Sequence, residues 1–336
     1  MRVGFIGLGN VGGKLAGSLV RNGFDTVVSD LDRGAAQHLM DQGAAWVDTP
    51  RQMAEICDVV ITCLPSPAAC SEVMEGPEGI IHGLSEGKVW MEMSTTDAAE
   101  VTRMGALVRA KGALPAECPV SGGCHRADTG NISIFVGGDR ATFERVLPLT
   151  TTLGRRVLHT GDLGTASTLK VMTNYLATAN LLSCCEALIT MKAAGMDMAT
   201  TYQAMTISSG TSFVHETESQ LILNGARDVN FTLDLILKDI GLFQTIAERN
   251  GVPLELSPMI VDIMKDGQTR YGERANTDDI IRRLEEATGL SVLADGFPAE
   301  LVDDEPEERG YEVVPPGRAV PDAAVAAVAD VVPTDT

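Results

Sequence analysis

The sequence of 336 residues predicts an α/β domain followed by an all-α domain, with one long helix joining the two. Short apolar runs alternate with amphipathic stretches over residues 1–163, which is typical of a parallel sheet covered by helices. Strand-like runs then disappear, and helical patterns fill residues 164–292. Between these halves, residues 165–194 contain no Gly or Pro and repeat apolar residues at three- and four-residue steps. At 1.5 Å per residue this stretch predicts an interdomain helix of roughly 45 Å.

Composition and charge narrow the class of protein. The formal net charge of −20 argues against nucleic acid or an anionic membrane as partner. No stretch is apolar for long enough to span a bilayer, and the chain starts without the basic and apolar regions of a signal peptide. The seven cysteines form no C-x-x-C pair, so we expect reduced thiols in the cytoplasm, and we predict no metal site.

The last part of the sequence, residues 293–336, differs from the rest. It is rich in Pro, Ala and Val, and from residue 295 onwards it has eleven Asp and Glu but two Arg. It shows no sustained periodicity. Such acidic segments bury little apolar surface, so we expect this tail to be largely disordered and separate from the folded body.

The elements expected within each domain follow the chain. Strands of the first domain are predicted at residues 3–6, 26–30, 58–65, 88–95, 113–123, 132–138 and 155–161. Helices between them are predicted at 11–22, 97–111 and 140–151. After the long helix, the second domain has helical patterns at 198–208, 233–250, 257–266 and 277–287.

The motif GLGNVGG lies between the first predicted strand and the first predicted helix. Its glycines Gly7, Gly9 and Gly12 have the G-x-G-x-x-G spacing, and Asp30 follows at the end of the second strand. In this context the motif indicates a Rossmann-type dinucleotide site, in which the turn, with Asn10 and Val11, meets the pyrophosphate at the start of the helix. The alternative is a purely structural glycine turn, since such turns are frequent.

Asp30 also bears on the choice between NAD and NADP. A carboxylate here can accept hydrogen bonds from the ribose hydroxyls and would repel a 2′-phosphate, which favours NAD. Arg33 follows three residues later, and an arginine at this place could instead serve the 2′-phosphate of NADP. We predict NAD in preference to NADP because the repulsion at Asp30 is the nearer effect.

Polar and glycine-rich residues follow several predicted strands. Ligands of open parallel sheets bind beyond the carboxyl ends of the strands. The residues at such places are Leu64-Pro65, Ser94-Thr95 and Ser121-Gly122-Gly123. Each of these could be a plain turn; their joint placement favours a ligand site.

Lys170 and Asn174 lie four residues apart on the long helix, so their side chains project from one face. On an arbitrary helix they would be a surface lysine and a surface amide. The alternative is a functional pair facing the first domain, because a lysine with a lowered pKa can act as a general acid/base.

Four blocks resemble the β-hydroxyacid dehydrogenase family: FIGLGNVGG, CPVSGG…TGNISIFVGG, GDLGTASTLKVMTN and FTLDLILKDIGLF. The resemblance covers residues 1 to about 290. It implies that Lys170 is the catalytic acid/base, that Asn174 helps to hold the substrate, and that the turn at 121–123 receives the substrate carboxylate. It also implies that Thr95 and Lys238 contact the cofactor, that Leu64-Pro65 line its path, and that the protein is a homodimer or homotetramer.

The sequence departs from the family's pattern in several places. CHRAD follows the SGG turn where small residues are usual, so His125 and Arg126 could be solvated loop residues, or the arginine could bind a second anionic group of the substrate. Ala166 replaces a glycine, and Phe213 lies near the place of a typical tryptophan. These departures bear on the identity of the substrate.

The function predicted is interconversion of a small β-hydroxyacid and its semialdehyde or keto acid by an NAD(P)-dependent oxidoreductase. The alternative is a catalytically silent dinucleotide-binding module with an assembly or regulatory role.

Overall fold

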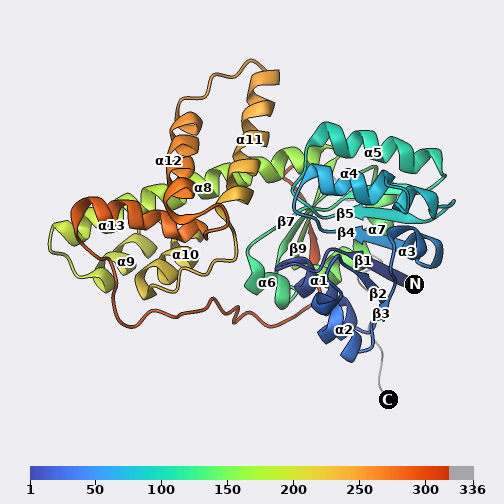
Figure 1. Cartoon of the computed structure of the whole chain (residues 1–336), viewed down its shortest axis with the longest axis horizontal. Helices are drawn as coiled ribbons and strands as arrows, with labels where there is room; N and C mark the ends of the chain where they lie inside the picture. The colour runs from blue at the N-terminus through green and yellow to red at the C-terminus, as the bar shows by residue number, and fades with distance from the viewer. Residues whose placement is uncertain (318–336) are drawn as a thin grey trace.

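The computed structural model describes residues 1–317 of the chain, as two domains joined by the long helix α8 (Thr165–Ala193) (Figure 1). The first domain is an α/β sandwich and the second is helical. This agrees with the fold class that the sequence predicts. In Figure 1, α8 begins beside the sheet and runs the length of the helical domain, so residues at its start face the first domain.

One ten-stranded sheet organises the first domain in the part of the chain that the structure describes. Its strands are β1 (Arg2–Ile6), β2 (Asp25–Ser29), β3 (Ala45–Trp46), β4 (Val59–Thr62), β5 (Val89–Glu92), β6 (Leu114–Glu117), β7 (Val120–Ser121), β8 (Ser133–Gly137), β9 (Arg156–Gly161) and β10 (Tyr311–Val313). The order is β10-β9-β8-β6-β5-β4-β1-β2-β3, with β7 paired to β8. The strand order reverses beside β1, between β2 and β4, and such switch points are where open α/β sheets bind ligands.

Helices cover both faces of this sheet. They are α1 (Gly12–Arg21), α2 (Gln37–Asp41), α3 (Pro50–Ile56), α4 (Pro67–Glu75), α5 (Ala98–Ala110), α6 (Cys124–Asp128) and α7 (Arg140–Leu153). Two separate apolar clusters lie between sheet and helices, one under α1 and α7 and the other under α3, α4 and α5. The central strands β4 and β5 are buried throughout, as a strand between two helical layers requires.

The helical domain packs around α8. Its other helices are α9 (Met198–Thr206), α10 (Phe213–Asn224), α11 (Leu233–Arg249), α12 (Leu256–Tyr271) and α13 (Arg282–Thr288), with a 3₁₀ turn at Thr277–Ile281 before α13. The core of this domain takes residues from α8, α10, α11 and α12, such as Leu188, Ile222, Ile240 and Met264. In Figure 1, α11 and α12 form a pair that extends away from the rest of the domain.

The expected elements are present with small shifts, and several short elements were not predicted. The run at 113–123 is divided into β6 and β7 around Cys118-Pro119, because proline has no amide hydrogen with which to continue a strand ladder. The helices α3, α4 and α10 were missed. Each begins after a Thr or Ser whose side chain accepts a hydrogen bond from the first turn, at Thr49, Ser66 and Ser212.

The expectation that residues 293–336 are disordered is wrong for the described part, residues 293–317, which we call the C-terminal strap. The strap starts on the helical domain, where Ala294 N donates to Leu223 O at 2.9 Å and Asn224 Nδ2 donates to Phe297 O at 2.7 Å. It then crosses to the first domain and ends as β10, parallel to β9 at the edge of the sheet (Figure 1). Residues 318–336 lie outside the described residues.

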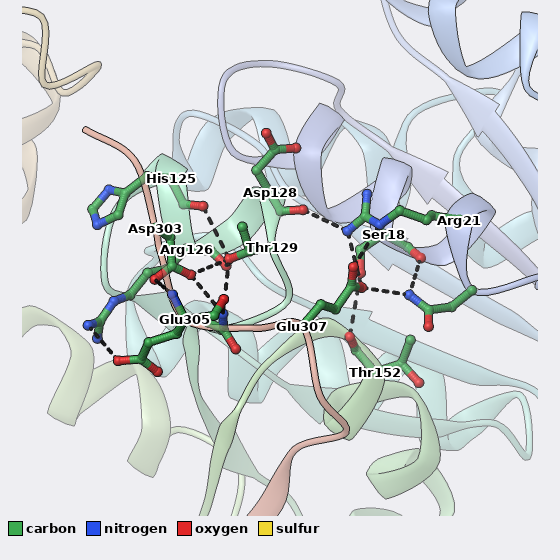
Figure 2. A network of polar contacts seen from close by, with 12 residues as sticks. Ser18, Arg21, His125, Arg126, Asp128, Thr129, Thr152, Asp303, Glu305 and Glu307 are labelled. Atoms are coloured by element: carbon green, nitrogen blue, oxygen red, sulfur yellow. Dashed lines mark hydrogen bonds and ion pairs between the residues drawn. The ribbon is translucent and has the colours of Figure 1, made fainter. Parts of the chain in front are cut away.

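The acidic residues of the strap meet basic partners on the first domain, which is why composition alone misjudged it. Glu307 pairs with Arg21 at 2.9 Å (Figure 2). Glu312 holds Arg140 through two hydrogen bonds, at 2.6 and 3.0 Å. Glu308 pairs with Arg155. The negative charge of the segment is thus matched locally, and backbone hydrogen bonds from Gly310 N and Tyr311 N complete the attachment.

Candidate active site

The glycine turn after β1 has the geometry that a dinucleotide site needs. Gly7 has φ +96°, and a Cβ there would lie 2.3 Å from Cys63 O. A Cβ on Gly12 would lie 2.0 Å from Gly7 O, so α1 can start this close to the turn only with glycine. A Cβ on Gly9, in contrast, would meet nothing within 4 Å, and Gly9 and Asn10 are exposed. The turn is therefore closed toward the protein and open at the side from which a pyrophosphate would approach, ahead of Val11 and the start of α1.

Asp30 lies one residue after β2, beside this turn. Its Oδ2 accepts a hydrogen bond from Leu8 N at 2.6 Å, and its Oδ1 accepts one from Asp32 N at 2.9 Å. These bonds hold the carboxylate at the carboxyl end of β2, where the ribose of a dinucleotide lies in this fold. Arg33 has its guanidinium 5.4 Å from the centre of the Trp46 ring, so a cation–π contact already engages it.

The loops after β4 and β5 are joined to each other. Leu64 N donates to Ser94 Oγ at 2.7 Å, so the Leu64-Pro65 turn lies against the end of β5. Pro65 is exposed and Thr95 is half-buried. Thr95 O accepts a hydrogen bond from Lys238 Nζ of α11 at 2.7 Å. This contact ties the helical domain to the sheet edge where the cofactor would lie.

Lys170, Asn174 and Lys238 belong to one chain of polar contacts, together with Asp239. Lys170 Nζ donates to Asn174 Oδ1 at 2.7 Å, and Asn174 Nδ2 donates to Asp239 Oδ2 at 2.5 Å. Asp239 Oδ1 lies 2.9 Å from Lys238 Nζ, which reaches Thr95 as described. The structure therefore brings together four of the residues that the sequence singled out, from α8, from α11 and from the loop after β5.

The electrostatics of this group single out Lys170. The residue is 8 % exposed, and burial lowers its pKa to about 8, because the charged amine loses hydration. The positive charge of Lys238 lowers the pKa further, whereas the carboxylate of Asp239 opposes the shift. An amine with this pKa exchanges a proton near neutral pH, which an ordinary surface lysine does not.

The Ser121-Gly122-Gly123 turn connects β7 to α6. Gly122 has φ +133° and Gly123 has φ +87°, both in the region that favours glycine. The turn reaches the helical domain through His125 and Arg126, two and three residues after Gly123. The His125 ring lies parallel to Phe213 of α10 at a centroid distance of 6.3 Å, and the guanidinium carbon of Arg126 lies 5.0 Å from the centre of the same ring.

Glu117, at the end of β6, is a buried residue next to this group that the sequence did not single out. It is fully buried, and its carboxylate accepts hydrogen bonds from Gly164 N at 2.6 Å, Ala166 N at 2.8 Å and Ser167 N at 3.0 Å. Ser167 Oγ adds a fourth contact at 2.5 Å. Burial raises the pKa of Glu117, and these hydrogen bonds oppose the shift. Glu117 thus caps the start of α8, one turn before Lys170.

Gly137 on β8 makes room for this carboxylate. It is the antiparallel partner of Glu117, and a Cβ on Gly137 would lie 2.1 Å from Glu117 Oε1. An acid four residues before the SGG turn, at the end of a strand otherwise free of charge, was the signal that could have pointed to this role.

Two further searches cover the described residues. Within residues 1–317, no cluster of three or more His, Cys, Asp and Glu is arranged to hold a metal ion. Over the same range, no helix combines the length and apolar character needed to cross a bilayer.

Comparison with known proteins agrees with this geometry. Residues 2–161 match the family model described as the NAD binding domain of 6-phosphogluconate dehydrogenase. Residues 164–284 match the model described as NAD-binding of NADP-dependent 3-hydroxyisobutyrate dehydrogenase. Both models end before the C-terminal strap.

Individual relatives match over most of their length. The chain is 30% identical to 2-(hydroxymethyl)glutarate dehydrogenase of Eubacterium barkeri over 87% of this chain and 97% of the relative. It is 29% identical to human mitochondrial 3-hydroxyisobutyrate dehydrogenase over 78% of this chain and 80% of that protein. The crystal structure of 3-hydroxyisobutyrate dehydrogenase from Salmonella typhimurium superposes with a TM-score of 0.77 at 26% identity, covering 84% of this chain and 99% of that one.

These matches extend across the dinucleotide turn, the Lys170 group and both domains. They favour an enzyme over a silent dinucleotide-binding module, because the relatives are dehydrogenases. The chain belongs to the β-hydroxyacid dehydrogenase family and is an NAD(P)-dependent oxidoreductase acting on hydroxyacids.

Proposed function

We propose that Lys170 is the general acid/base of this enzyme and that the substrate binds between Lys170, Asn174 and the turn at residues 121–123. The observation that carries the proposal is the burial of Lys170, with a pKa lowered to about 8, in contact with Asn174. A base must be deprotonated for part of the time at the working pH, and this lysine meets that condition.

The proposed steps follow from the groups present. The backbone amides and hydroxyl of the 121–123 turn hold the substrate carboxylate. Asn174 positions the substrate hydroxyl, and Lys170 Nζ takes its proton during oxidation and returns it during reduction. The glycine turn and Asp30 would hold NAD(P), which would supply the hydride acceptor for the carbon that bears this hydroxyl. Asp239 orients Asn174 and Lys238. Because Lys238 also contacts Thr95 of the first domain, the two domains are held in one arrangement.

A panel of hydroxyacids tests this function. We expect nicotinamide reduction, followed by absorbance, with at least one of 3-hydroxyisobutyrate, glycerate, 4-hydroxybutyrate, threonate and 2-(hydroxymethyl)glutarate. The same assay with Asn174→Ala should raise KM for the active substrate while leaving the affinity for the nicotinamide cofactor unchanged. The absence of turnover with every member of the panel, with either cofactor, would count against the proposal.

We further propose that NAD is preferred over NADP, because the Asp30 carboxylate accepts from the ribose hydroxyls and repels a 2′-phosphate. In Asp30→Ala, the ratio of kcat/KM for NADP to that for NAD should rise about 10–100-fold, the range for losing hydrogen bonds to a charged group. Asp25→Ala is the matched control, since it removes the same charge at the other end of β2, where Asp25 pairs with Arg2. A wild-type preference for NADP would overturn this proposal.

The setting of the enzyme is also a proposal. We place it in the cytoplasm as a homodimer or homotetramer that associates through the helical domain. The described cysteines are all free thiols, which suits a reducing compartment. Large apolar side chains are exposed at several places on the helical domain, namely Leu176, Met196, Ile207 and Met259, and their burial between subunits would favour association.

A further inference from the structure

Arg126 is an arginine at the edge of the proposed substrate site. It lies on α6, three residues after Gly123, and its side chain folds back over the turn. A Cβ on Gly122 would lie 3.5 Å from Arg126 Cδ. The guanidinium then reaches across to Phe213 of the helical domain, 5.0 Å from the ring centre. Arg126 therefore lies between the turn that would hold the substrate carboxylate and the domain that supplies Lys170.

Phe213 provides the platform for this arginine. It is the first residue of α10 and is 43% exposed, although aromatic side chains are usually buried. The cation–π contact holds the guanidinium plane against an apolar surface and leaves its N–H edge available for an anion. His125 lies against the same ring, so contacts with Phe213 orient both side chains of the CHRAD segment that face it.

In the structure the guanidinium meets a carboxylate of the C-terminal strap. Arg126 Nη2 donates to Glu305 Oε1 at 3.3 Å, through one nitrogen (Figure 2). Other arginines facing the strap are held more closely: Arg140 binds Glu312 at 2.6 and 3.0 Å, and Arg21 binds Glu307 at 2.9 and 3.2 Å. The contact of Arg126 with Glu305 is long and uses few of its five N–H donors.

The backbone of the strap is anchored beside Arg126 independently of this ion pair. Asn131 Nδ2 donates to Glu305 O at 2.9 Å and to Asp303 Oδ2 at 2.8 Å, and Thr129 also donates to Asp303 (Figure 2). The side chain of Glu305 is 47% exposed. It can therefore leave the guanidinium without detaching the strap, and an exposed pair of this kind is weak.

We propose that Arg126 binds a second carboxylate of the substrate, so that the enzyme favours dicarboxylic β-hydroxyacids, and that Glu305 occupies the guanidinium until such a substrate displaces it. The inference rests on the proposed function, because it takes the first carboxylate to lie at residues 121–123. A carboxylate is the ligand that Arg126 already meets, and a free dicarboxylate can engage it through two nitrogens where Glu305 uses one. A substrate with a short carbon chain between its two carboxylates could reach both anion sites, because Arg126 lies next to the Gly122 turn.

The test compares two substrates that differ in the second carboxylate. Steady-state kinetics are measured with 3-hydroxyisobutyrate, which has one carboxylate, and with 2-(hydroxymethyl)glutarate, which has two. Arg126→Gln should raise KM for the dicarboxylate about 10–100-fold, the range for losing a charge-assisted bidentate contact. KM for the monocarboxylate should change by less than about threefold, since it has no group at Arg126.

Glu305→Gln tests the second half of the proposal and does not depend on the folding of the Arg126 variant. It should lower KM for the dicarboxylate by about 2–5-fold, the range of an exposed ion pair, and leave the monocarboxylate unchanged. Arg155→Gln is the matched control for Arg126→Gln, because it removes the arginine that pairs with a different strap carboxylate, Glu308. It should leave both KM values within about twofold.

The possible outcomes distinguish failure of the role proposed for Arg126 from failure of the proposed function. Equal changes with both substrates in Arg126→Gln, or no response of the dicarboxylate KM to Glu305→Gln, would overturn the role of Arg126. Turnover of the monocarboxylate alone by the wild-type enzyme would overturn it as well. Failure of the proposed function has a different signature, in which neither substrate nor any other hydroxyacid reduces the cofactor.

Discussion

Lys170→Ala should lower kcat by ~10²–10⁴, the usual loss when a general acid/base is removed. The affinity for NAD should be nearly unchanged, because the dinucleotide would be held mainly by the glycine turn and Asp30, in the other domain. Stopped-flow or steady-state absorbance gives kcat, and quenching of protein fluorescence by the cofactor gives its Kd. Parallel losses in kcat and in cofactor affinity would indicate a folding defect.

Lys170→Arg separates the two roles that a lysine could have. A guanidinium keeps its proton at any working pH, so it can attract a carboxylate but cannot act as a base. We expect this variant to be nearly as slow as Lys170→Ala. Near-normal turnover would show that Lys170 neutralises substrate charge, and the acid/base role would be wrong.

The pH profile gives an independent check. Burial lowers the pKa of Lys170 to about 8, so the neutral amine, which is the base, becomes the major form above that pH. kcat/KM for oxidation should therefore rise as the pH increases through about 8. The reverse reaction needs the protonated amine, and its rate should fall over the same range. If oxidation and reduction both became faster, or both became slower, as the pH increased through about 8, this role for Lys170 would be contradicted.

Glu117→Gln should have the largest effect on stability. The carboxylate faces three backbone amides of α8, and none of these can turn round to accept a hydrogen bond. A glutamine would direct its own N–H₂ at one of these amides. Buried donors would then lack an acceptor, and each would cost ~1–3 kcal/mol of stability. We expect the free energy of unfolding to fall by about 2–4 kcal/mol, measured by urea denaturation. kcat should fall too, because the start of α8 positions Lys170.

Glu92→Gln is a close control, since Glu92 lies opposite Glu117 on the neighbouring strand and is also buried. Its partners are Ser94 N at 2.7 Å and Thr62 Oγ1 at 2.9 Å. A glutamine can keep the first bond through its oxygen and donate to the second, because a hydroxyl can rotate and accept. We expect a much smaller loss of stability. Equal losses in the two variants would mean that capping of α8 is not the cause.

The sequence predicted the residues whose chemistry depends on local spacing. The glycine turn has its signature within seven residues, and Lys170 and Asn174 share a face because they are one helical turn apart. The structure places Thr95 and Lys238 in the same chain of contacts, although they are 143 residues apart, and it was the family resemblance that named them. Nothing in local spacing could have paired them.

The features that escaped prediction depend on partners distant in sequence. Glu117 caps a helix 47 residues later, and an isolated acid at a strand end does not reveal which amides it will meet. Asp239 pairs with its neighbour Lys238, but its bond to Asn174 joins α11 to α8, 65 residues apart in sequence. The strap was misjudged because disorder was inferred from its own charge. Its order comes from arginines that lie 150 or more residues earlier, at Arg21, Arg140 and Arg155.

The position of β10 has a consequence for how the protein is made. The sheet of the first domain takes its last strand from residues 311–313, after the whole helical domain has been synthesised. Between Gly161 and Tyr311 the ribosome adds about 150 residues, which takes roughly 8–30 s at ~5–20 residues per second. During that interval β9 is an open sheet edge, the kind of surface on which strands of other chains can pair. The nascent chain therefore exposes the edge of β9, which β10 covers in the described fold, and a fragment ending at residue 163 would keep that edge exposed.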